Sequence, residues 1–231
     1  FPMEKYALLP LQLLHEGIAN EENIFSPEPL SREWILTVHT VEYLKKLESL
    51  SLSKSEIRRT GFPLSRALVE REKNIMGGTV QCVDYALEYG VAGNAAGGTH
   101  HAFRDSGEGF CLLNDVALGA EYAIRHHGLK RILILDLDVH QGNGTAKIFE
   151  DDSRVFTFSM HGAKNFPMHK EKSDLDVGVP DGMEDDAYLD LLRHHLDKTI
   201  DTAAPELIFY ISGVDVLKTD KLGRLALSRA G

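Results

Sequence analysis

The chain has 231 residues, 43% of them hydrophobic and 26% charged, an ordinary globular composition that fits one α/β domain over 1–231. Its formal charge of −10 argues against direct nucleic-acid binding and against an anionic membrane surface, since both favour basic proteins, and suits a cationic peptide or amine better. No apolar run approaches the ~18 residues that span a bilayer, and two cysteines are too few for a disulfide framework, so we expect a cytoplasmic protein.

The first part of the chain is predicted to be helical. Periodic apolar residues and capping residues predict helices over 1–20, 31–38, 41–50 and 64–88. The last of these is expected to break or bend at Gly77-Gly78. Its charged residues, including Arg71 and Glu72, are interpreted as a solvated surface, and His39 as a core histidine with satisfied hydrogen bonds.

A short strand is predicted over 91–98, where small residues allow backbones to approach closely. Two histidines, His100 and His101, follow it directly. Adjacent histidines at a strand end can serve as metal ligands or as a general acid and base. Similar pairs at 126–127 and 194–195 fall in charged helices, and we interpret them as solvated surface.

Potential ligands concentrate behind the apolar run 132–135, which is typical of a buried parallel strand. Asp136, Asp138 and His140 alternate with apolar residues, so extended backbone places all three on one side. Clustered carboxylates repel one another, which indicates a metal or a strongly shifted pKa. Glycines at 142 and 144 then allow a sharp turn into a helix predicted over 145–150.

Two further buried strands are predicted over 155–160 and 207–211, with a helix over 185–202 between them. Alternating strands and helices indicate a parallel sheet whose strand ends share one edge. Asp215 follows the last strand and should therefore approach Asp138 and His140. These three side chains form a candidate set of nitrogen and oxygen ligands with an open position, as catalytic zinc requires. Iron, cobalt and manganese also fit the set.

Five ordered motifs closely resemble the zinc-dependent histone deacetylase family of the arginase/deacetylase superfamily. They are GGTHHAF (97–103), GFCLLND (109–115), DLDVHQGNGT (136–145), FSMH (158–161) and SGVDVLKTDKLGRL (212–225). The resemblance covers nearly the whole chain, and its HQGNG form is most similar to the bacterial and class IV branch, which includes acetoin-utilisation-type proteins. It implies a three-layer α/β fold, a mainly parallel sheet with helices on both faces, and hydrolysis of an acetylated amine, usually acetyl-lysine.

The resemblance also implies roles for individual residues. It assigns the binding of Zn2+ (Fe2+ or Co2+ as alternatives) to Asp138, His140 and Asp215. It makes His101 the proton-transfer residue, while His100, oriented by Asp136, supplies electrostatic stabilisation. Phe110 and Phe166 match the aromatic walls of a narrow acyl-lysine tunnel.

A structural potassium site is implied next to these residues. The resemblance assigns K+ to Asp136 and Ser159 together with the backbones of Asp138, His140 and Met160. A monovalent cation beside Asp136 would influence the acidity of His100.

The chain departs from the family in two respects. Asn143 stands where some branches have an aspartate paired with the second histidine, so His101 is expected to lack a charged partner. The sequence also ends before the glycine-rich segment whose tyrosine stabilises the oxyanion, and we expect it to lack N-terminal and C-terminal family segments. Loss of one oxyanion donor costs about 10²- to 10³-fold in turnover, so residues 1–231 alone are expected to be weakly active or inactive.

Other functions remain open from the sequence. The same metal chemistry would serve an acetylpolyamine deacetylase or an enzyme that removes longer acyl groups from lysine. A manganese ureohydrolase fits less well, because its two-metal site uses more carboxylates than DLDVH and Asp215 supply. A metal-stabilised module that binds acyl-lysine without turnover is the alternative outside the enzymes; Asn143 allows it, whereas the intact His100, His101 and ligand set count against it. The sequence does not specify an oligomeric state.

Overall fold

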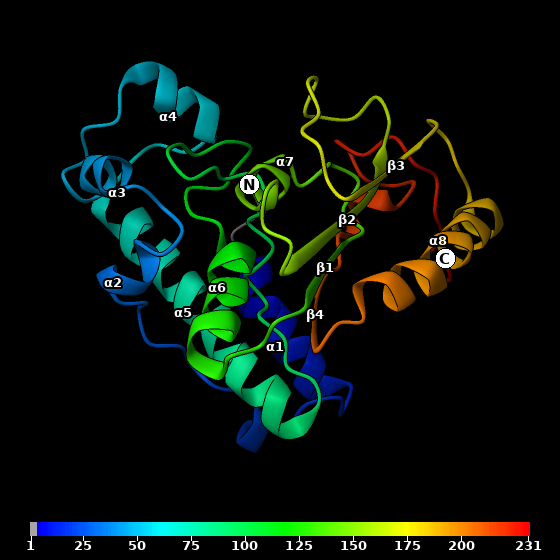
Figure 1. The fold of residues 1–231 in the computed structure, drawn as a ribbon, viewed down its shortest axis with the longest axis horizontal. Helices are drawn as coiled ribbons and strands as arrows, with labels where there is room; N and C mark the ends of the chain where they lie inside the picture. Colours follow the sequence, from blue (N-terminus) through cyan, green and yellow to red (C-terminus); the bar gives the residue numbers. More distant parts are fainter. Residues whose placement is uncertain (1–3) are drawn as a thin grey trace.

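The computed structural model describes residues 4–231 and centres on a parallel sheet (Figure 1). The strands are β1 (Ile132–Asp136), β2 (Val155–Gly162), β3 (Leu175–Val179) and β4 (Leu207–Ile211). Their order across the sheet is β3-β2-β1-β4, and each neighbouring pair is parallel. The two strands that end in potential ligands, β1 and β4, are therefore neighbours.

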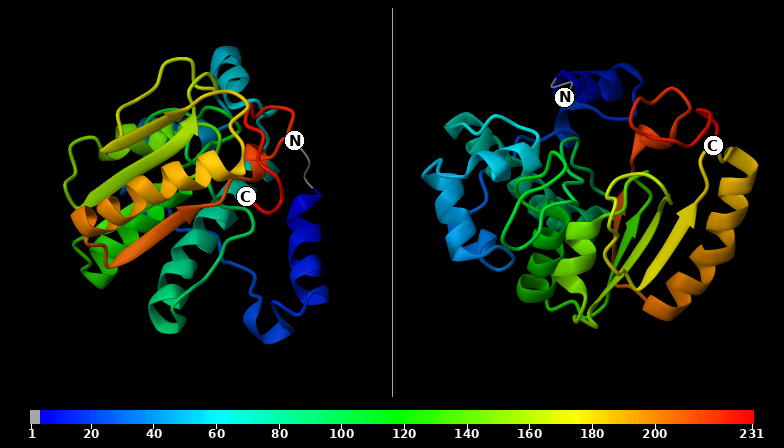
Figure 2. Two further views of the ribbon diagram at one scale, coloured as in Figure 1. Left: turned by 90° about the vertical axis from the view of Figure 1, so that its right-hand side faces the viewer. Right: turned by 90° about the horizontal axis from the view of Figure 1, so that it is seen from above.

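Helices cover both faces of the sheet, which gives the predicted three-layer α/β architecture (Figure 2). The helices are α1 (Lys5–His15), α2 (Arg32–Ile35), α3 (Val41–Glu48), α4 (Lys54–Thr60), α5 (Arg66–Tyr89), α6 (Asp115–His127), α7 (Asn143–Phe149) and α8 (Asp185–Ala203), with short 3-10 turns η1 (Glu21–Asn23) and η2 (Val214–Val216). α1 lies at the periphery, and none of its residues is buried. Along the described chain, no helix is long and apolar enough to cross a membrane.

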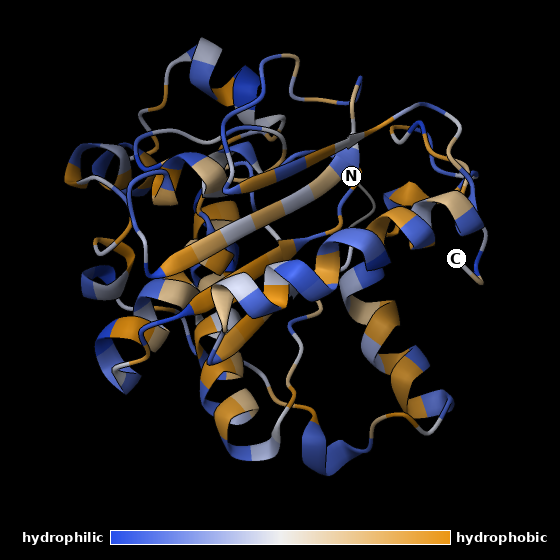
Figure 3. Cartoon of the chain, turned by 45° about the vertical axis from the view of Figure 1, so that its right-hand side comes forward, coloured by the Kyte–Doolittle hydropathy of each residue, from blue (hydrophilic) through white to orange (hydrophobic). Residues whose placement is uncertain are grey.

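Side chains alternate between two hydrophobic cores along β1. Ile132 and Ile134 pack with α5 and α6 on one face of the sheet. Leu133 packs with Phe158 and Met160 on the other face, beneath α8. The strands are correspondingly rich in hydrophobic residues (Figure 3). Because both faces of β1 are covered, the continuous apolar sequence of this strand is explained.

The strand predicted over 91–98 is wrong, because this segment forms loops and turns. The side-chain amide of Asn94 donates to the carbonyl of Ile75 and to the hydroxyl of Thr79, both at 2.9 Å. At the end of the segment, Gly98 has a φ of +88°, which extended backbone does not adopt. The side chain of Asn94 thus binds this segment to α5, and no adjacent strand pairs with it among the described residues.

α5 differs from the sequence-based expectation in two respects. The helix does not break at Gly77 and Gly78, which serve close packing: a Cβ on Gly77 would lie 1.9 Å from the carbonyl oxygen of Glu28. Glu72 is not on the solvated face, since only 1% of it is exposed, and it pairs with Arg71 at 2.9 Å. Charge alone did not reveal that this turn of α5 faces the interior.

β4 is predicted as a fully buried strand, but one side of it is exposed. It lies at the edge of the described sheet, and α8 packs against β1 and β2 instead. Ile208 and Tyr210 are 44% and 59% exposed. His39 is buried, as predicted, and its Nε2 accepts the backbone N–H of Asn114 at 3.0 Å. Its Nδ1 has no hydrogen-bond partner within residues 4–231, so the predicted hydrogen bonds are only partly satisfied.

Candidate active site

The loop after β1 is held in shape by its own acidic side chains. The backbone N–H of Asp138 donates to Asp136 Oδ1 at 3.1 Å, and that of His140 donates to Asp138 Oδ1 at 2.8 Å. The N–H of Val139 donates to Oδ1 of Asp215, which comes from the neighbouring strand end, at 3.0 Å. The carboxylates therefore organise the backbone that presents them.

Asp138, His140 and Asp215 form a group that can hold a metal ion, with one candidate ligand atom of each within 4.8 Å of the others. His140 Nδ1 lies 3.0 Å from Asp138 Oδ1 and 3.1 Å from Asp215 Oδ2. Burial raises the pKa of Asp215, and the charge of Asp138 adds to this effect. A cation between the carboxylates would relieve their repulsion, and one nitrogen with two oxygen donors matches a catalytic zinc site.

Two glycines allow the strands to approach closely at this group. A Cβ on Gly213 would lie 2.5 Å from Cα of Asp138, and a Cβ on Gly223 would lie 1.8 Å from the carbonyl oxygen of Asp215. Neither glycine was among the predicted site residues. Both lie in the motif SGVDVLKTDKLGRL (212–225), but only the folded backbone shows that they allow this close approach.

His100 and His101 lie side by side, with ring centroids 4.1 Å apart, and both are buried. Nδ1 of His100 lies 2.7 Å from Asp136 Oδ2, whereas Nδ1 of His101 lies 2.7 Å from the amide oxygen of Asn143. The two imidazoles therefore have unlike partners, one a carboxylate and the other an amide.

Their protonation differs accordingly. Burial alone would lower the pKa of His100, but the adjacent Asp136 carboxylate outweighs it and raises this pKa to about 9. Burial and the neighbouring His100 hold the pKa of His101 well below its ordinary value. Near neutral pH, these opposite shifts favour the charged form of His100 and the neutral ring of His101, which can accept a proton.

The two predicted tunnel residues are both partly exposed, and Phe166 lies beside His101. The ring of Phe166 stands edge-on to His101, with centroids 5.0 Å apart, and is 38% exposed. Phe110 is 40% exposed and packs on Phe62 at 5.5 Å. Gly109 precedes Phe110, and a Cβ there would lie 2.7 Å from the His101 ring and 3.1 Å from Phe166.

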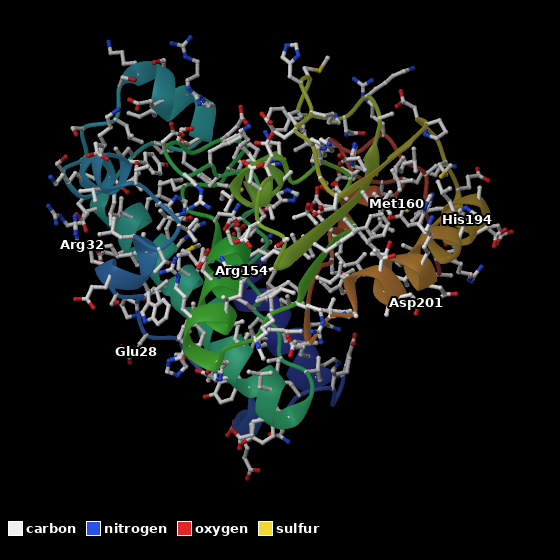
Figure 4. The ribbon with its side chains drawn as sticks, viewed as in Figure 1. Glu28, Arg32, Arg154, Met160, His194 and Asp201 are labelled. Atoms are coloured by element: carbon white, nitrogen blue, oxygen red, sulfur yellow. The ribbon has the colours of Figure 1, made fainter. Side chains whose placement is uncertain are left out.

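The residues assigned to potassium come from β1, from β2 and from the loop after β1. Asp136 of β1 pairs in register with Ser159 of β2, and Met160 follows in the buried part of that strand (Figure 4). Ser159 Oγ also lies 3.0 Å from Nδ1 of His161, a residue to which the sequence analysis gave no role.

Two further polar residues near the site were missed. Glu108 accepts a hydrogen bond from Nδ2 of Asn143 at 2.8 Å. Gln141 donates to the carbonyl of Glu171 and to Asp176 Oδ1, both at 2.7 Å. Gln141 lies inside the motif DLDVHQGNGT, and Glu108 directly precedes the motif GFCLLND, yet spacing alone could not identify their partners.

The other histidine pairs lie away from this site, as predicted. His126 and His127 are exposed at the end of α6. His194 is exposed on the outer side of α8 (Figure 4). Neither pair takes part in the group that can hold a metal.

Comparison with known proteins decides the family. The family model described as "Histone deacetylase domain" matches residues 2–231. The chain belongs to the histone deacetylase family. This membership accounts for the coincidence of a parallel sheet, a histidine pair and an Asp-His-Asp group, and it supports a deacetylase-like hydrolase.

Individual relatives agree. The chain is 47% identical to an uncharacterised protein of Picosynechococcus, of which it covers 77%, and 32% identical to "Histone deacetylase 2" of Arabidopsis thaliana, of which it covers 62%. A crystal structure of an HDAC homolog complexed with SAHA matches 97% of the chain with a TM-score of 0.85 and 30% identity. An HDAC homolog from Aquifex aeolicus matches with a TM-score of 0.83 and 29% identity. The chain covers 66% and 65% of these two structures.

Proposed function

We propose that the chain contains the catalytic residues of a zinc-dependent deacetylase that hydrolyses the acetamide of acetyl-lysine. The observation that carries this proposal is the position of the histidine pair beside the candidate metal group. Nε2 of His100 lies 4.0 Å from Asp138 Oδ1, and the ring of His101 lies 6.0 Å from that of His140. A general base and a fixed positive charge thus adjoin a site for a Lewis acid.

Asp138, His140 and Asp215 would hold the metal, for which we propose Zn2+, with Fe2+ or Co2+ as alternatives. When bound, the metal would polarise the acetyl carbonyl and lower the pKa of a water ligand towards ~7. The partly buried carboxylates and the neighbouring imidazole are chemically suited to this role.

The two histidines divide the proton chemistry. His101, neutral in its buried position, accepts the proton of the attacking water and later passes it to the departing amine. His100, protonated through its contact with Asp136, supplies positive charge next to the developing oxyanion. The unlike partners of the two rings support this division.

For the substrate we propose an acetylated lysine side chain that passes between Phe110 and Phe166. Both aromatic rings are partly exposed, and Phe166 stands directly against His101. The charge of −10 favours a cationic peptide or amine. The structure solved with SAHA belongs to a homologue with the same fold, and we expect this chain to bind SAHA at the corresponding position. Acetylpolyamines and longer acyl groups are the other substrates to assay.

We also propose a K+ site next to the catalytic residues. The register pairing of Asp136 with Ser159 brings two of its oxygen-bearing side chains onto neighbouring strands. Backbone carbonyls of Asp138, His140 and Met160 would complete the site. A cation there would offset part of the Asp136 charge that His100 experiences.

The function is tested first with Asp138→Ala, using the longest natural protein that contains this chain. We expect one zinc per chain and release of acetate from an acetyl-lysine peptide in the unsubstituted protein. Removal of Asp138 leaves two ligands, so the variant should lose the metal and at least 10²-fold in kcat/KM. Metal analysis and the peptide assay measure both effects.

Asp201→Ala is the matched control, because this aspartate is exposed on α8 away from the sheet (Figure 4). It should keep both metal and activity. Bound zinc without turnover on acetyl-lysine, acetylpolyamine or long-acyl substrates would contradict the proposed enzymatic activity and favour an acyl-lysine-binding module. A metal-free protein would contradict the ligand assignment itself.

A further inference from the structure

Asn143 lies between His101 and the carboxylate of Glu108, a residue with no part in the proposed proton chemistry. Its Oδ1 lies 2.7 Å from His101 Nδ1, and its Nδ2 donates to Glu108 Oε2 at 2.8 Å. Asn143 is 2% exposed, so water has little access to the amide. The three side chains form a hydrogen-bonded line, His101–Asn143–Glu108, that ends at the turn carrying Glu108.

The chemistry of this line fixes the orientation of the amide. An ionised carboxylate only accepts hydrogen bonds, so Glu108 requires the NH2 end of Asn143. The carbonyl end must then face His101, whose Nδ1 must be the donor. In a neutral imidazole with a proton on Nδ1, Nε2 keeps its lone pair and can accept a proton. Without Glu108, nothing in this line would distinguish the two ends of the amide.

The backbone holds Glu108 firmly in this place. Residues 108–111 form a two-residue hairpin in which Gly109 and Phe110 both have positive φ, +55° and +66°, the pattern of a type I′ turn. Glu108 and Cys111 exchange two backbone hydrogen bonds of 3.0 and 2.9 Å. The N–H groups of Gly109 and Phe110 donate to the last turn of α4. Little conformational freedom is left to lose when Glu108 binds the amide.

His100 and His101 are thus supported in different ways. His100 contacts the carboxylate of Asp136 directly at 2.7 Å, which favours its charged form. His101 contacts a neutral amide, and the carboxylate of Glu108 stands one side chain further away. This spacing keeps the directional hydrogen bond while it reduces the Coulomb stabilisation of an imidazolium.

We propose that Glu108 is a positioning residue that acts through Asn143 to hold His101 in the tautomer with a proton on Nδ1 and a free Nε2. This inference rests on the proposed function only in so far as His101 is the proton acceptor. The tautomer itself is a property of the chain that can be measured without substrate.

The first test is 15N NMR of the histidine rings in the purified protein, with His101 assigned from the signals lost in His101→Ala. We expect the Nδ1–H tautomer in the unsubstituted protein and a shift towards Nε2–H in Glu108→Ala. Glu42→Ala, which removes an exposed carboxylate on α3, should change nothing. An unchanged tautomer in a folded Glu108→Ala variant would overturn the proposal.

The second test exchanges the amide of Asn143 and the carboxylate of Glu108. These substitutions keep the size of both side chains, so the test does not depend on the folding of Glu108→Ala. Asn143→Asp alone places two carboxylates against each other and should lower kcat/KM about tenfold or more. Adding Glu108→Gln restores one acceptor and one donor, so the double variant should recover at least about tenfold over Asn143→Asp. If the two effects simply multiply, Glu108 does not act through Asn143.

These tests separate failure of the inference from failure of the proposed function. A protein without deacetylase activity but with a Glu108-dependent His101 tautomer would contradict the function and keep the positioning role. An active protein in which the His101 tautomer does not change in Glu108→Ala would support the function and contradict the positioning role.

Discussion

Gly109 lies against both His101 and Phe166. A Cβ at this position would lie 2.7 Å from Cδ2 of His101 and 3.1 Å from Cε1 of Phe166. The φ of +55° would also strain any residue with a side chain. Gly109→Ala should therefore displace His101 or Phe166 and lower kcat/KM by at least about tenfold, measured on the acetyl-lysine peptide.

Gly93→Ala provides the matched control for this substitution. Gly93 lies in an exposed loop, and a Cβ there would have no heavy atom within 4 Å. It should behave as the unsubstituted protein. Full activity of Gly109→Ala would mean that the turn carrying Glu108 and Phe110 does not constrain His101 during catalysis.

At the scale of elements, one carboxylate replaces a strand partner for the segment that leads to the histidine pair. Asp115, at the start of α6, accepts the backbone N–H groups of Gly98 and Thr99 and the hydroxyls of Thr99 and Thr79. Asp115→Asn would turn one acceptor into a donor that faces buried donors. We expect a loss of about 2 to 4 kcal/mol in the free energy of unfolding, measured with urea.

The control for this loss is Asp201→Asn, an exposed position where the same change should cost less than about 0.5 kcal/mol. If both variants unfold at the same urea concentration, Asp115 does not organise the loop.

Sequence reasoning located most of the strands and failed for the segment that Asp115 binds. The strand ranges 132–135, 155–160 and 207–211 and the helix 185–202 were predicted to within two residues, because periodicity and apolar runs are local signals. The segment 91–98 was predicted wrongly because the side chain of Asn94 donates to α5 and the backbone N–H of Gly98 donates to Asp115 of α6, contacts that no local pattern reports.

At the scale of the whole molecule, the candidate metal group could be predicted because parallel strands bring their carboxyl ends to one edge. Asp138 and Asp215 are far apart in sequence, and strand order alone makes them neighbours. The link from Glu108 to Asn143 could not be predicted, because it depends on a turn anchored to α4. Nor could the burial of Glu72, because it depends on how α5 packs within the molecule.

Glu72 makes the stability of the whole molecule depend on pH. It is 1% exposed, Oε1 pairs with Arg71, and Oε2 has no hydrogen-bond partner within residues 4–231. Burial raises the pKa of Glu72 from 4.5 to about 7, against the opposing charge of Arg71. Because the folded-state pKa lies above the unfolded one, the folded state binds the proton more tightly. This contribution to stability is complete below pH 4.5 and is lost as the pH rises through about 7.

The free energy of unfolding should therefore fall by on the order of 1 to 3 kcal/mol between pH 5 and pH 8 through this group. Glu72→Gln keeps the shape of the protonated side chain and removes the titration, so the variant should gain stability relative to the unsubstituted protein as the pH rises. Urea unfolding at pH 5, 6, 7 and 8 measures the difference in the free energy of unfolding between the two proteins. Contributions from all other titrating groups cancel in this difference. Glu70→Gln, an exposed position on the same helix, should leave the slope unchanged. Parallel pH profiles for Glu72→Gln and the unsubstituted protein would show that Glu72 stays ionised in the folded chain, with Arg71 outweighing the cost of its burial.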